Sequence, residues 1–148
     1  MRDFSLSKWH DTSSYTAKTA ITHTLKEAGY EPQFICGHNN IINVIVRYQS
    51  YQIQISEDTT RIEVFIDIDA HFDLKSVYGY MCVNELNKRF FYAKFWLDND
   101  SSLIAKVDIP ATTLSSGYIT TRAIMALDSG MDEIYDLIQY YVQKANES

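Results

Sequence analysis

The chain has 148 residues, of which 46% are hydrophobic, and a formal net charge of -6. This composition is typical of one globular domain and excludes a disordered chain. No apolar run reaches the ~18 residues that a membrane-spanning helix needs, and the polar residues 1–11 predict no secretory signal.

The first predicted helix spans about residues 14–28. Thr12, Ser13 and Ser14 are candidate N-caps, because their side-chain oxygens can accept from the free amides of a first helical turn. Gly29 is predicted to stop the helix, and Pro32 forbids its continuation. The apolar stripe falls at helical spacing and consists of Ala17, Ile21, Leu25 and Ala28.

Three strands are expected next, over residues 41–48, 51–55 and 61–69, with a weaker one near 33–36. The first two are predicted to be joined by a turn at Gln49 and Ser50. The third alternates most clearly, with one face formed by Ile62, Val64, Ile66 and Ile68. Such alternation indicates an antiparallel sheet with one buried and one solvated face.

A second helix is predicted over residues 74–88, with Asp73 as its N-cap. Its expected core-facing side chains are Leu74, Val77, Tyr78, Met81 and Leu86. A hairpin follows, with strands at 91–97 and 103–109 joined by a polar turn at residues 98–101 and ended by Pro110.

The last predicted helix runs over about residues 118–145. Its main stripe is Ala123, Leu127, Ile134, Ile138, Tyr141 and Ala145. Ser129 and Gly130 predict either a break or close helix packing, because an interior glycine costs about 1 kcal/mol relative to alanine. The order α-β-β-β-α-β-β-α predicts an α+β fold with helices flanking an antiparallel sheet, in one domain over residues 1–148 with its core at about 14–145.

Little in the sequence points to catalysis. Asp67, Asp69 and His71 recur at alternate positions and could bind a divalent metal, but a solvated strand face is the favoured interpretation. Cys36 and Cys82 are expected to be separate thiols in a reducing cytosol. No recognised catalytic or phosphate-binding motif occurs, so we expect a protein that is not an enzyme and needs no cofactor.

Tyrosine is unusually frequent, with 11 residues, and tyrosine is enriched at protein interfaces. The candidate protein-binding residues are Tyr92, Trp96, Tyr135 and Tyr141. A patch of Met131, Tyr135, Tyr140 and Tyr141 on the last helix would either be exposed to a partner or be buried against the sheet.

Several short motifs resemble the YbjN family, described as bacterial sensory transduction regulators. They are the helix end from Leu25 to Pro32, the segment Asn84-Glu85-Leu86-Asn87, the strand and acidic turn over 91–100, and Ser116-Gly117. The resemblance implies a fold similar to type III secretion chaperones, often dimeric and without catalytic residues. Asn84 and Asn87 are expected to tie the middle helix to the next strand through backbone hydrogen bonds.

These observations lead to a functional hypothesis with two competitors. We expect a cytoplasmic, chaperone-like or regulatory domain that binds another protein and forms a homodimer, with no nucleic-acid or membrane partner. Basic clusters are lacking beyond Lys88-Arg89, which argues against nucleic-acid binding. One alternative is an acidic immunity or antitoxin protein, whose charge would speed its encounter with a basic toxin. The other is a metal protein that uses Asp67, Asp69 and His71.

Overall fold

The computed structural model describes residues 6–35, 37–58, 60–71, 76–111 and 115–147. In the described residues the elements follow the order α-β-β-β-β-α-β-β-α, which confirms the predicted α+β class and the weaker early strand expected near residues 33–36. Their bounds are α1 Leu6–Glu27, β1 Gln33–Ile35, β2 His38–Val46, β3 Gln49–Ile55, β4 Arg61–His71, α2 Val77–Arg89, β5 Lys94–Leu97, β6 Ser102–Pro110 and α3 Ser116–Glu147.

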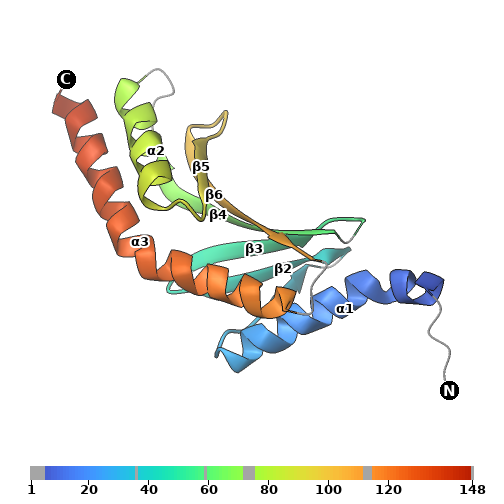
Figure 1. Ribbon diagram of the computed structural model, residues 1–148. Helices are drawn as coiled ribbons and strands as arrows, with labels where there is room; N and C mark the ends of the chain where they lie inside the picture. Colours follow the sequence, from blue (N-terminus) through green and yellow to red (C-terminus); the bar gives the residue numbers. More distant parts are fainter. Residues whose placement is uncertain (1–5, 36, 59, 72–75, 112–114, 148) are drawn as a thin grey trace.

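The strands form one antiparallel sheet in the order β1-β2-β3-β4-β6-β5. Figure 1 shows the three helices on one side of this sheet, with α3 running from α1 to α2. The core lies between the helices and the sheet. The alternation predicted for β4 is confirmed, because Ile62, Val64, Ile66 and Ile68 are all fully buried. Within the described ranges, none of the helices has the length and hydrophobicity that crossing a lipid bilayer requires.

The first hairpin turns two residues earlier than predicted. Val46 pairs with Gln49, so Arg47 and Tyr48 form the turn, and Gln49 and Ser50 belong to β3. Both turn residues have positive φ, 48° and 71°. Two-residue turns of this kind match the twist of the strands, but they normally carry Asn or Gly. The sequence lacks that signal, which explains the wrong prediction.

The two ends of α1 differ in how well the sequence predicted them. The helix begins at Leu6, so Thr12, Ser13 and Ser14 lie inside it and the capping prediction is wrong. The predicted stop at Gly29 is confirmed. Its φ is +91°, its N–H donates to the Lys26 carbonyl, and the Tyr30 N–H donates to the Leu25 carbonyl. This pair of bonds is the Schellman arrangement, which glycine favours.

The second helix begins later, and faces a different way, than predicted. Ser76 caps α2 by accepting a hydrogen bond from the Tyr78 N–H, whereas the predicted cap, Asp73, lies outside the described residues. The buried face is formed by Gly79, Cys82 and Leu86, and Val77 and Met81 point outward. Gly79 and Cys82 are small residues on the buried face, and α2 packs against α3 and β5.

The last helix is continuous through Ser129 and Gly130, so the prediction of close packing is confirmed and a break is not found. Figure 1 shows that α3 bends midway. The Ser129 hydroxyl donates to the Met125 carbonyl one turn earlier, an interaction that bends helices. Of the two alternatives for the patch on this helix, burial holds for Met131 and exposure for Tyr140.

The second hairpin agrees well with its prediction. The turn before Ser102 is closed by Asp98, whose Oδ1 accepts from the Asp100 and Ser102 N–H groups. Ser101 adopts a φ of 64° within it. The preceding strand is shorter than predicted, because β5 begins at Lys94 and Phe91 is largely exposed.

Candidate protein-binding surfaces

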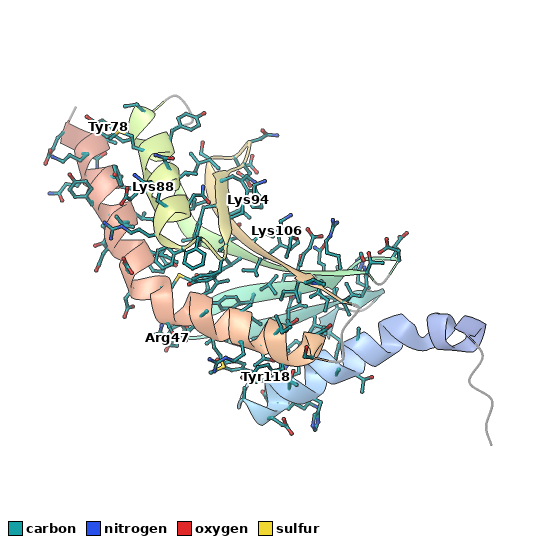
Figure 2. All side chains as sticks on the ribbon, in the orientation of Figure 1. Arg47, Tyr78, Lys88, Lys94, Lys106 and Tyr118 are labelled. Atoms are coloured by element: carbon teal, nitrogen blue, oxygen red, sulfur yellow. The ribbon has the colours of Figure 1, made fainter. Side chains whose placement is uncertain are left out.

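The side of the sheet that the helices leave uncovered is a candidate binding surface, which we term the open sheet face. One of its cross-strand rows runs through Asn43, Gln52, Phe65, Lys106 and Lys94. A second row pairs Asp67, Ile104 and Trp96. Figure 2 places Lys94 and Lys106 on this side, and Arg47 and Tyr118 on the opposite side near α3. Further members of the face include Ile41, Ile45, Ser50, Gln54, Glu63 and Asp108.

A shallow groove of about 340 Å³ crosses the middle of the open sheet face. It is lined by Asn43, Ser50, Gln52, Gln54, Phe65, Ile66, Asp67 and Ile104. Most of these side chains are uncharged. The Gln54 amide donates to Gln52 Oε1, and Asn43 Oδ1 is buried without a hydrogen bond from any described residue. A surface of amides and apolar side chains can contact a polypeptide without desolvating unpaired charges.

The charges beside the groove largely compensate one another. Lys106 Nζ lies 3.0 Å from Glu63 Oε2 and 3.5 Å from Asp108 Oδ1, and 5.9 Å from the centre of the Phe65 ring. The hydrogen bond to Glu63 raises the pKa of Lys106 above its usual value. These paired charges border the apolar side chains of the open sheet face, so the face has little net charge around Lys106.

The four predicted binding residues do not share one surface. Trp96 lies half-buried on the open sheet face, opposite Ile104. The three tyrosines lie on the helix side. Tyr92 donates its hydroxyl to the Ala126 carbonyl of α3, and Tyr135 donates to Gln49 Oε1. Tyr141 is half-buried, and its ring lies edge-on to that of Tyr140, with 5.1 Å between the two ring centres.

These contacts give at least two of the tyrosines a structural role. Burial raises the pKa of Tyr92 and of Tyr141. The hydroxyls of Tyr92 and Tyr135 connect α3 to the segment before β5 and to β3. Trp96 is therefore the predicted residue that lies on the candidate surface. The amide residues of the groove were missed, although uncharged Gln at alternate strand positions was a signal.

The structure describes the side chain of only one of the three candidate metal ligands. Asp67 is exposed on the open sheet face, and the side chains of Asp69 and His71 lie outside the described residues. A register shift between Ile68 and His71 interrupts the alternation on which their spacing depended. Among the side chains that the structure describes, no group of three or more His, Cys, Asp or Glu could hold a metal ion.

A second exposed surface lies on α2 and was not predicted. Val77, Tyr80 and Met81 are 61%, 55% and 45% exposed, and they fall on one side of the helix, away from the buried Gly79, Cys82 and Leu86. We term these three residues the outer α2 stripe. A helix with apolar residues on two sides commonly has a second partner.

Comparison with solved structures identifies the fold. The chain superposes on the HopA1-SchA chaperone-effector complex with a TM-score of 0.62 and 15% identity, covering 86% of this chain and 97% of that chain. The type III secretion chaperone SycH of Yersinia pestis, in complex with a fragment of YscM2, gives a TM-score of 0.56 and 16% identity. That match covers 82% of this chain and 98% of that chain. This chain has the type III secretion chaperone-like fold.

YbjN from E. coli shares the arrangement, with a TM-score of 0.52 and 13% identity over 88% of this chain and 91% of that chain. The expected YbjN-like and chaperone-like fold is thereby confirmed. No protein-family model and no curated protein sequence matches the chain. The likeness at 13% to 16% identity concerns the fold alone, so the partner must be argued from the surfaces of this chain.

Proposed function

We propose that this chain is a non-enzymatic, chaperone-like domain that binds a client polypeptide across its open sheet face. The observation that carries the proposal is the groove around Asn43, Gln52 and Phe65, whose lining is uncharged except for Asp67, on a face that none of the described helices covers. The likeness to SycH and to the HopA1-SchA complex supports it, because both structures contain a chaperone with another protein. We place the domain in the cytoplasm, where the free thiol of Cys82 would stay reduced.

Site-specific photo-crosslinking in the native host tests the client-binding face. A crosslinking residue at Ile45, which is 57% exposed on the open sheet face, is expected to capture one defined protein. The same residue at Tyr118, 61% exposed on the opposite side, is the matched control and should not capture it. Capture from position 118 alone, or from neither position, would refute binding across this face.

The captured protein then permits a quantitative test. Trp96→Ala is expected to weaken its affinity roughly tenfold or more, because a large interface aromatic commonly contributes more than ~1.4 kcal/mol. Circular dichroism would confirm that the variant is folded. Tyr118→Ala is the control and should leave the affinity within about twofold. Equal affinities for wild type and Trp96→Ala would contradict the proposed face.

We also propose a homodimer formed through the outer α2 stripe. Its three large apolar side chains are exposed, and one helix face packed against its own copy across a twofold axis forms a self-complementary contact. Tyr80→Glu should convert the protein to a monomer in analytical ultracentrifugation. Tyr118→Glu removes a similarly exposed tyrosine from α3 and should leave the dimer intact. A wild-type monomer at micromolar concentration would refute this proposal.

The immunity or antitoxin alternative receives no support from these structural neighbours. It also predicts a different partner, a basic toxin attracted by the net charge of -6. The crosslinking experiment separates the two, because a captured toxin would be inactivated by wild-type protein in an activity assay. A captured client that is kept unaggregated, with no activity suppressed, would favour the chaperone function.

A further inference from the structure

Two charged side chains on the open sheet face lack a counter-charge among the described residues. Asp67 on β4 and Lys94 on β5 are both exposed, and neither forms an ion pair with a described residue. Their neighbour Lys106 differs, because its Nζ lies 3.0 Å from Glu63 Oε2 and 3.5 Å from Asp108 Oδ1. Asp67 and Lys94 therefore remain available to the charges of a bound protein.

Asp67 is the one charged residue among the described residues that line the groove. Ile104 lies directly opposite it on β6, and Phe65 lines the groove two residues before it on β4. Lys106 is its diagonal neighbour across β4 and β6, but the Lys106 ammonium is already bound by Glu63. The Asp67 carboxylate thus lies on a largely neutral surface and can pair with one basic side chain.

Lys94 lies directly opposite another lysine. It is paired with Lys106 in the antiparallel register of β5 and β6, and Figure 2 shows both side chains on the same side of the sheet. Like charges in directly opposite positions repel each other. Lys106 is compensated by its two carboxylates, whereas Lys94 has none among the described residues. An acidic side chain from a partner would lower this repulsion, so charge complementarity selects an anion at Lys94.

Two half-buried apolar side chains lie between these unpaired charges. Asp67, Ile104 and Trp96 form one cross-strand row, and Lys94 lies two residues before Trp96 on β5. Neighbouring strands are ~4.8 Å apart and a strand rises ~3.4 Å per residue, which puts the Cα atoms of Asp67 and Lys94 about 12 Å apart. The acidic and the basic position therefore flank an apolar one on the open sheet face.

We propose that the client segment bound here is extended and places a basic side chain against Asp67 and an acidic side chain against Lys94. An apolar residue between them contacts Ile104 and Trp96. In an extended chain, residues four positions apart point to the same side and lie about 14 Å apart, close to the spacing of the two charges. The expected pattern is therefore a basic and an acidic residue at positions i and i+4, with an apolar residue at i+2. This inference rests on the proposed client-binding function and adds the chemistry of the bound segment.

Selection from a random peptide library tests this pattern before the client is known. Phage that display random peptides of about twelve residues are selected on the full-length wild-type protein. Each selected peptide is synthesised, and its Kd is measured with wild type and with Trp96→Ala. Peptides that lose affinity about tenfold with Trp96→Ala bind the open sheet face. Among these, the basic and acidic residues four positions apart should occur well above their frequency in the unselected library.

Charge-removing variants assign each position of the pattern. Asp67→Asn should weaken the binding of a selected peptide about threefold, and Lys94→Gln by a similar factor, because exposed ion pairs contribute little individually. Replacing the basic residue of the peptide by glutamine should cost about threefold with wild type and nothing further with Asp67→Asn. The matched controls are Asp136→Asn on α3 and Lys26→Gln on α1. They remove the same charges from exposed positions of the helices and should leave the affinity within about 1.5-fold.

Three results would overturn the charge pattern and leave client binding intact. They are Trp96-dependent peptides that lack the pattern, losses in the helix controls equal to those in Asp67→Asn, and a basic peptide residue that contributes as much with Asp67→Asn as with wild type. A selection that yields no peptide, or only peptides insensitive to Trp96→Ala, would instead count against binding across the open sheet face and would remove the charge pattern with it.

Discussion

Gly130 of α3 lies directly against the ring of Phe90, the residue that ends α2. A Cβ atom at position 130 would lie only 2.7 Å from Phe90 Cε1. The Phe90 ring has little room to move, because it is buried and packs against two other rings. Its centre lies 6.2 Å from the centre of the Tyr92 ring and 6.0 Å from that of Phe95. The glycine therefore permits α2 and α3 to approach each other, which fixes the outer α2 stripe relative to the sheet.

Gly130→Ala is expected to lower the free energy of unfolding by about 1–3 kcal/mol, the usual cost of overpacking a core. This loss should exceed the gain of up to about 1 kcal/mol in helix propensity. Urea unfolding measures the difference, and Gln139→Ala, at an exposed position of the same helix, is the control. Restored stability in the double variant Gly130→Ala, Phe90→Leu would assign the loss to this contact, whereas a Gly130→Ala protein more stable than wild type would refute it.

Asn87 of α2 occupies the hydrogen-bonding edge of β5. Its Nδ2 donates to the Phe95 carbonyl at 2.9 Å, and its Oδ1 accepts from the Phe95 N–H at 2.8 Å. The side chain thus takes the place of a neighbouring strand, as the sequence predicted for Asn87. Asn84 was expected to act likewise, but it is exposed and makes no described hydrogen bond to β5. Covering an edge strand in this way prevents pairing with another chain.

Asn87→Ala should destabilise the protein by about 1–3 kcal/mol, because it leaves the buried Phe95 amide and carbonyl without partners. Hydrogen exchange of the Phe95 amide should accelerate, and aggregation on heating should increase. Asn84→Ala lies on the same helix and should change the stability by less than about 0.5 kcal/mol. If the two variants behave alike, Asn87 does not protect this edge.

The sequence predicted those elements whose signals are local. The alternation of β4, the Asp98 turn and the stop at Gly29 each depend on residues that are adjacent in the chain, and all three are confirmed. The fold class followed because these elements leave few ways to cover one face of an antiparallel sheet.

The remaining features depend on contacts between distant residues. The side of α2 that faces the core is formed by the small residues Gly79 and Cys82 together with Leu86, a choice that hydrophobicity alone does not indicate. The hydroxyls of Tyr92 and Tyr135 bond to groups 34 and 86 residues away, so counting tyrosines could not separate structural from binding side chains. The groove requires the register of β2, β3 and β4, since its lining comes from several strands.

Tyr48 holds a backbone conformation that suits glycine better. Its φ is 71°, and the left-handed region costs a side-chain-bearing residue roughly 1–2 kcal/mol. Because the side chain is fully exposed, Tyr48→Gly should raise the free energy of unfolding by about 0.5–1 kcal/mol. Tyr48→Ala keeps the strain and should not stabilise. A Gly variant no more stable than the Ala variant would show that the turn is unstrained.

Burial of the Cys82 thiol predicts how stability changes in alkaline solution. Desolvation raises the pKa of Cys82 from 9.0 to about 12, so the folded protein keeps this proton at pH values where the unfolded chain loses it. The unfolded state then binds fewer protons, and stability must fall as the pH rises from about 9 to about 12, by up to ~1.4 kcal/mol per pH unit. Cys82→Ala removes this contribution, so its stability should fall less steeply than that of wild type between pH 9 and 10.5, measured by urea unfolding under reducing conditions. Parallel pH profiles for the two proteins would mean that the thiol ionises as easily in the folded state as in the unfolded one.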